Sequence, residues 1–478
     1  MKNTKLHELL INLSANELKS FEKFLASPYN NSNEKIRALY KYITWYSPSF
    51  TSDDLDKQAI FRYLYPDEEF KEKRIDLLFS DLKSLIEKFL VNEKLVNNNI
   101  DFKTVLLSIF REKGCRKNFV SLVNEIDKRA EKEFNKTIEF YYSNVKKEYE
   151  LSQYEYIKKF YSSEASFKAL ENDTDLFIVS VKLISFILIY KHQKEVDTKI
   201  NYKAWFEKEI ISFIQENLTL IRREHAVIFI LYLILMTLIH PEEEAYYKSL
   251  KKFVIKNIYN LNADILRDTL IQMTNYCNDR TYSNPVKFSK ELFEIYEMLD
   301  KNNLFIIKKY IEQTDFINAV IASLVVNNTK WAYNFLNRYK NKLNPEIKED
   351  TFSLVNAELY FREKKYEKAL EELNNIKSNV FYFYIRIKVI RIKIYNELNE
   401  EEALNYVIDS VKHYLARNRR KVSSIYSSGM KYLNYVRKLL KYRVKPIQNK
   451  ITKTIIQLEK ETGMASKLWL LEKFNELK

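Results

Sequence analysis

One stretch of the sequence carries many positive charges and no carboxylate. Between Ser410 and Leu458 there are 13 lysine and arginine residues and no aspartate or glutamate, in a chain whose formal net charge is +15. A lysine-rich composition alone would have placed acidic residues there as well. If this segment is a binding surface and not only a solvated helix face, its positive field would suit an acidic protein or the phosphates of a nucleic acid.

Helical spacing sharpens this prediction. If residues 424–444 form a helix, each side chain is turned by about 100° from the previous one, so four lysines and Asn434 share one face. These lysines are Lys431, Lys438, Lys441 and Lys445. Five residues share the opposite, apolar face: Tyr432, Leu433, Val436, Leu439 and Leu440. Tyr435 and Tyr442 border the basic face, where their rings could stack on bases.

Four further cations lie just upstream of this helix: Arg417, Arg419, Arg420 and Lys421. We expect them in the turn between two helices, where several guanidinium groups could converge on one anion. The sequence leaves open whether the basic surface is only a solvated helix face, binds an acidic protein or binds nucleic acid. Membrane attachment is disfavoured, because the apolar face is needed for packing.

Residues that could catalyse a reaction are few and scattered. The five histidines lie in no recognisable motif, and three glycines cannot supply a phosphate-binding loop. Cys115 and Cys277 form no CxxC, so we interpret both as core residues in a reducing compartment. Acidic clusters lie at 66–73, 241–247 and 399–404, where helices should begin. Carboxylates favour the positive end of the helix dipole, so helix capping explains these clusters. We predict no catalytic, cofactor-binding or metal-binding residues and no enzymatic activity.

The scarcity of turn-forming residues indicates the fold class. With three glycines and seven prolines in 478 residues, sheets with many hairpins are disfavoured. Apolar residues recur at helical spacing almost everywhere, and no stretch alternates strictly between apolar and polar residues. The sequence therefore predicts an all-α fold, in which the abundant aromatic side chains fill the space between helices.

Two apolar stretches bear on the cellular location. Residues 176–190 and 226–239 are shorter than the roughly 20 residues that a membrane span needs, so we expect buried central helices. His225 and His240 bracket the second stretch and suit the ends of its helix. Charges interrupt the amino-terminal segment before an apolar run reaches signal-peptide length, which predicts a cytoplasmic protein.

The pattern of helices and breaks divides the chain into four predicted segments. In the first, Ser14 and Glu17 have the spacing of a capping box, and Pro28 should end the helix that they begin. The four segments are a compact helical N-terminal unit at 1–100, an array of paired helices at 101–320, tetratricopeptide-like repeats with a basic C-terminal part at 321–446, and C-terminal capping helices at 447–478.

The stretch NAELYFREKKYEKALEELNNI at 356–376 resembles a tetratricopeptide repeat. Its small and aromatic positions follow the spacing of that two-helix motif: Ala357, Tyr360, Tyr366, Ala369 and Leu373. The early Trp and terminal Pro of the motif are missing, and the next unit keeps only Tyr395 and Ala403. The resemblance implies an α-solenoid-like array of antiparallel helix pairs.

A wider resemblance covers nearly the whole chain. The segments LSANELKSFEKFLASPYNN, FSDLKSLIEKFL, NAELYFREKKYEKAL and SKLWLLEKFNEL are similar to a family of uncharacterised bacterial helical proteins of about this length. That resemblance implies the fold and brings no activity. We therefore expect a helical-repeat scaffold that binds another protein, with a nucleic-acid-binding protein using the basic surface at 412–453 as the alternative.

Overall fold

A computed structural model describes residues 4–97, 99–157, 164–196, 204–281, 284–307, 309–378, 380–418, 423–461, 464 and 466–478. The described residues form 24 α-helices, two 3-10 helices, η1 (Asp53–Leu55) and η2 (Lys340–Lys342), and one two-stranded sheet. The sheet pairs β1 (Ile306–Ile307) with β2 (Tyr310–Ile311) in antiparallel register. The all-α fold expected from the sequence is therefore confirmed.

Contacts between α-carbons divide the chain into two compact units, and the chain passes from one unit to the other at 132/133, 141/142 and 173/174. The first unit comprises residues 1–132 and 142–173, and the second comprises 133–141 and 174–478. The helices up to the last of these points are α1 (Lys5–Asn12), α2 (Ala15–Ala26), α3 (Glu34–Thr44), α4 (Lys57–Leu64), α5 (Glu72–Asn97), α6 (Asn99–Glu112), α7 (Arg116–Ala130), α8 (Ile138–Ile157) and α9 (Glu164–Val196).

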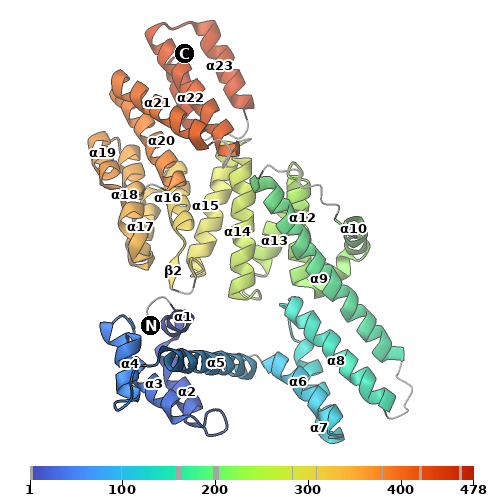
Figure 1. The fold of residues 1–478 in the computed structure, drawn as a ribbon. Helices are drawn as coiled ribbons and strands as arrows, with labels where there is room; N and C mark the ends of the chain where they lie inside the picture. The colour runs from blue at the N-terminus through green and yellow to red at the C-terminus, as the bar shows by residue number, and fades with distance from the viewer. Residues whose placement is uncertain are drawn as a thin grey trace. The chain divides into compact units, whose positions relative to one another are not determined.

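The remaining helices belong to the second unit and run to the end of the chain (Figure 1). They are α10 (Glu207–Glu216), α11 (Leu218–Glu224), α12 (Ala226–Ile239), α13 (Glu244–Lys256), α14 (Ala263–Arg280), α15 (Pro285–Lys301), α16 (Gln313–Val325), α17 (Thr329–Tyr339), α18 (Pro345–Arg362), α19 (Tyr366–Asn375), α20 (Phe381–Leu398), α21 (Glu401–Asn418), α22 (Ser423–Val444), α23 (Gln448–Lys460) and α24 (Lys467–Glu476).

Helices α1 to α5 share one hydrophobic core. The capping box is present as predicted: Ser14 N donates to Glu17 Oε2 over 2.7 Å, and Glu17 N donates to Ser14 Oγ over 3.2 Å. Helix α2 then ends at Ala26, before Pro28. Its Phe21 is fully buried, with a ring centroid 5.3 Å from that of Phe89 on α5. The apolar face of α5 thus joins the amino-terminal helices into one packed group.

The two apolar stretches, at 176–190 and 226–239, differ in burial. Helix α12 lies between His225 and His240, as predicted, and most of its side chains are buried. Only one face of α9 is buried, because Ile178 and Leu188 are exposed while Leu183 is fully covered. The expectation of a buried central helix at 176–190 is therefore wrong for the face that carries Ile178, Val181 and Leu188. Among the described residues, no helix has both the length and the apolar character to cross a membrane.

In the second unit, each helix packs mainly on the next helix or the next but one. Helix α18 contacts its neighbour α19 and also α16 and α20 (Figure 1). Ala357 on α18 and Ala369 on α19 are fully buried, so these two helices approach closely, as the spacing predicted.

The turns after α6, α15, α16, α18 and α20 share one conformation, and in the first two the left-handed residues are Gly114 and Asn303. Asn327, Lys364 and Asn399 have φ values of 60°, 59° and 58°, which is the left-handed region that usually favours glycine. In each of the last three turns an amide bonds to the carbonyl five residues back: Asn328 N to Ser323 O, Lys365 N to Tyr360 O, and Glu400 N to Tyr395 O, at 2.8, 2.8 and 3.0 Å. The scarcity of glycine therefore did not remove this turn, because asparagine and lysine adopt it here.

Candidate partner-binding groove

The side chains of α22 form an apolar face and a lysine face, as the sequence predicted. Its apolar face is buried in a core shared with residues of α21, α23 and α24, and the five predicted positions all belong to it: Tyr432, Leu433, Val436, Leu439 and Leu440. Lys431 and Lys438 are half-buried, whereas Lys441 and Lys445 are exposed. The helix therefore turns its lysine face away from the core.

The tyrosines beside the lysine face do not present their rings to solvent. Tyr435 and Tyr442 are 6% and 8% exposed and belong to the same core, so the expected stacking platforms are absent. The Tyr442 hydroxyl lies 3.4 Å from Thr454 Oγ1 on α23. Burial, followed by the charge and hydrogen bond of Glu461, raises the pKa of Tyr435 to about 12. This hydroxyl consequently stays protonated and acts as a donor.

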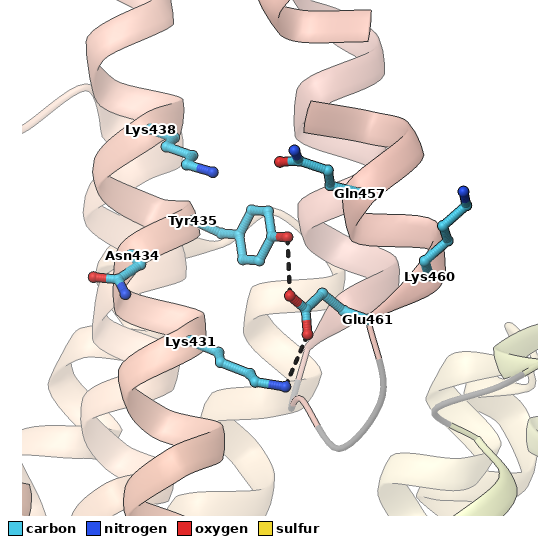
Figure 2. A pocket seen from close by; sticks show the side chains of 7 residues that line it. All are labelled: Lys431, Asn434, Tyr435, Lys438, Gln457, Lys460 and Glu461. Carbon is cyan, nitrogen blue, oxygen red and sulfur yellow. Dashed lines mark hydrogen bonds and ion pairs between the residues drawn. The ribbon is translucent and has the colours of Figure 1, made fainter. Parts of the chain in front are cut away.

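A solvent-open groove of about 660 Å³ lies between α22 and α23. Helix α22 and the end of α23 each supply polar side chains to it, as Figure 2 shows. The residues that line it are Lys431, Asn434, Tyr435, Lys438, Gln457, Lys460 and Glu461. Two of the four lysines predicted on α22, Lys431 and Lys438, are therefore part of the groove.

Glu461 is the central acceptor of this groove. Lys431 Nζ lies 2.9 Å from its Oε2, and the Tyr435 hydroxyl donates to its Oε1 over 3.3 Å. Lys467 fixes this end of α23, because its Nζ donates to the carbonyl oxygens of Glu459 and Glu461 over 2.7 and 2.9 Å. An ammonium group and a hydroxyl in the groove thus already bind one carboxylate, that of Glu461.

The other two lysines of the groove have different surroundings. Lys438 Nζ lies 5.0 Å from the centre of the Tyr435 ring, and its side chain points toward α23 in Figure 2. Lys460 lies at the rim, with its side chain directed away from Tyr435. Gln457 points from α23 toward α22. An ammonium group and an amide therefore face each other across the part of the groove beyond Glu461.

Several cations of the basic segment bind groups within the protein. Arg437 NH2 lies 2.8 Å from Asp409 Oδ1, and Arg443 donates to the side chains of Asn396 and Asn399. Asp409 and Glu461 lie just outside the segment that has no carboxylate. The folded chain thus neutralises part of the charge that the sequence left unbalanced.

Of the four cations that precede α22 in the sequence, the structure describes one. Arg417 is exposed in the last turn of α21. Arg419, Arg420 and Lys421 lie outside the described residues, so the predicted convergence of guanidinium groups on one anion stays a prediction. Sequence reasoning missed Gln457, Lys460 and Glu461 as groove residues, because nothing in their spacing links them to α22.

A second polar arrangement lies at the start of α12. The hydroxyl of Tyr141 and Nδ1 of His225 are 2.7 Å apart, and both residues are buried. Burial, with a smaller contribution from the positive charge of Lys136, lowers the pKa of His225 to about 4. Among the residues that the structure describes, no group of three His, Cys, Asp or Glu side chains could hold a metal ion.

No protein-family model, no curated protein and no solved structure matches this chain. The resemblances to tetratricopeptide repeats and to a bacterial family therefore rest on the quoted residues alone, and both stay predictions.

Proposed function

We propose that this protein is a non-enzymatic helical-repeat scaffold that holds another protein. The observation that carries this proposal is the recurrence of one helix-ending turn, whose last three occurrences follow α16, α18 and α20. The left-handed residues of these three turns, Asn327, Lys364 and Asn399, are separated by 37 and 35 residues, close to the roughly 34-residue period of tetratricopeptide repeats, whereas Asn303 after α15 precedes Asn327 by 24 residues. Helix pairs that recur at such a period stack into an α-solenoid, whose extended surface usually binds macromolecules.

The groove between α22 and α23 supports a protein partner more than a nucleic acid. A strand of nucleic acid presents closely spaced phosphates, and Glu461 would repel one of them. Non-specific binding of single strands also uses exposed aromatic rings, whereas Tyr435 and Tyr442 are buried. A protein segment can place its charges beside Lys438 and keep uncharged groups beside Glu461.

A pull-down divided into nuclease-treated and untreated halves tests the proposal. The tagged full-length chain is incubated with native lysate, and both protein and nucleic acid are identified in each eluate. We expect one protein partner to be retained equally in both halves. Loss of every partner after nuclease treatment would favour the nucleic-acid alternative and would contradict the proposal.

A salt titration of the captured complex adds a second criterion. Binding through phosphates weakens along a log–log line, with a slope of about −0.7 per contact on single strands. A protein partner held partly by hydrogen bonds and apolar contacts should show a shallower dependence. A steep slope for the purified complex would again favour nucleic acid.

A further inference from the structure

The groove shows by its own contacts which chemical group it accepts. The carboxylate of Glu461 lies between Lys431 Nζ, at 2.9 Å, and the Tyr435 hydroxyl, at 3.3 Å (Figure 2). The side chains of Lys431 and Glu461 are 42% and 27% exposed, so this pair is open to solvent. A carboxylate in this groove therefore has both a cation and a hydrogen-bond donor within reach.

A second position for an anion follows along the same helix. Lys438 is seven residues after Lys431, which places it about 10 Å further along α22. Within the described part of the chain, Lys438 has no carboxylate partner, and its ammonium group lies over the ring of Tyr435. Gln457 faces it from α23 (Figure 2). This position offers an ammonium group and an amide, but no acid from the described residues pairs with it.

The amides around this position suit a peptide. Asn434 and Gln457 are exposed, and each amide side chain can donate to a carbonyl and accept from an N–H group of an extended backbone. The 10 Å between Lys431 and Lys438 corresponds to about three residues of extended chain. The groove can therefore accommodate a short extended segment with an acidic side chain near Lys438.

We infer that the groove between α22 and α23 binds an extended acidic segment of a partner protein, with an aspartate or glutamate carboxylate paired to Lys438. The inference rests on the proposed function, since it names the partner chemistry of the scaffold. Glu461 has a defined part in this arrangement. It occupies one of the two anion positions and repels a second carboxylate nearby, so it weakens the binding of segments in which every residue is acidic.

Fluorescence anisotropy with two labelled probes tests the inference on the full-length chain. The first probe is a decapeptide of alternating glutamate and glycine, and the second is a decathymidine strand. Both are titrated at low ionic strength against wild-type protein and against Lys438→Glu, Glu461→Gln and Lys412→Glu. Lys412 is a matched control, because it is an exposed lysine of the same basic segment that lies on α21, outside the groove.

The expected pattern is specific to the groove. Lys438→Glu should weaken peptide binding at least tenfold, Glu461→Gln should strengthen it at least threefold, and Lys412→Glu should change it less than twofold. Circular dichroism of each variant checks that its helices are retained, and Lys438→Gln removes the cation without adding a negative charge.

Three results would overturn the inference. One is the absence of peptide binding by the wild-type protein. Another is an equal loss of peptide affinity in Lys438→Glu and Lys412→Glu, which would indicate a diffuse charge effect. The third is tight decathymidine binding that requires Lys438 while peptide binding does not. A partner that survives nuclease treatment and binds Lys438→Glu normally would leave the scaffold proposal standing and refute only this site.

Discussion

Lys431 on α22 and Glu461 at the end of α23 are 30 residues apart in sequence, yet their charged atoms lie 2.9 Å apart. The pair lies at the edge of a packed core, with both side chains partly exposed. Exposed ion pairs contribute about 1 kcal/mol or less to stability, because water screens the charges. The fold therefore depends little on this contact, and its carboxylate can be altered without unfolding the protein.

Glu461→Gln should lower the free energy of unfolding by less than about 1 kcal/mol. The glutamine oxygen can still accept from the Tyr435 hydroxyl, so only the charge is removed. Urea denaturation followed by circular dichroism measures the change. A loss above about 2 kcal/mol would show that the pair is structural, contrary to its exposure.

The buried imidazole of His225 should make stability fall on mild acidification. Its pKa is about 4 in the folded chain and about 6.5 when unfolded, so the unfolded state takes up the proton first as the pH falls. The loss begins near pH 6.5, is complete near pH 4 and amounts to at most about 3 kcal/mol from this residue.

His225→Gln tests this dependence, because glutamine can keep a hydrogen bond to the hydroxyl of Tyr141 but does not titrate. The difference in unfolding free energy between pH 7 and pH 4.5 should be smaller in this variant than in the wild type. His240→Gln at the exposed other end of α12 is the control and should keep the wild-type difference. Equal differences in all three proteins would show that His225 does not cause the loss of stability at low pH.

Gly429 permits the close approach of α21 and α22. A Cβ atom at this position would lie 2.6 Å from Leu415 Cδ1, and Leu415 is fully buried. Alanine normally stabilises a helix interior by about 1 kcal/mol over glycine, but overpacking costs about 1–3 kcal/mol. Gly429→Ala should therefore give no gain and a net loss of up to about 2 kcal/mol.

A double-mutant cycle separates the two effects at this contact. Adding Leu415→Ala removes the clashing atoms, so Gly429→Ala should become stabilising in that background, although the double variant is less stable than wild type. Thermal unfolding of the four proteins measures the coupling. Additive changes would show that Leu415 moves aside at no cost.

The two cysteines should differ in reactivity. Burial raises the pKa of Cys277 to about 12, and its thiol donates to the hydroxyl of Tyr247 over 3.2 Å. Cys115 is half-buried at the start of α7, so its interpretation as a core residue is wrong. A thiol reagent should label one cysteine in the native protein and two in urea, and Cys115→Ser should abolish the native labelling.

Local patterns in the sequence were sufficient to predict the helices themselves. Ser14 and Glu17 predicted the start of α2, and the apolar positions from Tyr432 to Leu440 predicted which face of α22 is buried. These predictions held because a cap involves residues of a single turn and a helix face is set by its period. The spacing of Ala357 and Ala369 likewise predicted a close helix pair.

The sequence by itself determined an all-helical chain, the two faces of α22 and a basic segment without internal acids. Only the tertiary structure decided what surrounds those lysines: Glu461 and Gln457 come from the far end of α23, and Asp409 comes from α21. It also buried the rings of Tyr435 and Tyr442. The physical reason is that helical periodicity fixes directions around one axis, whereas the neighbours of each face depend on the packing of helices distant in sequence.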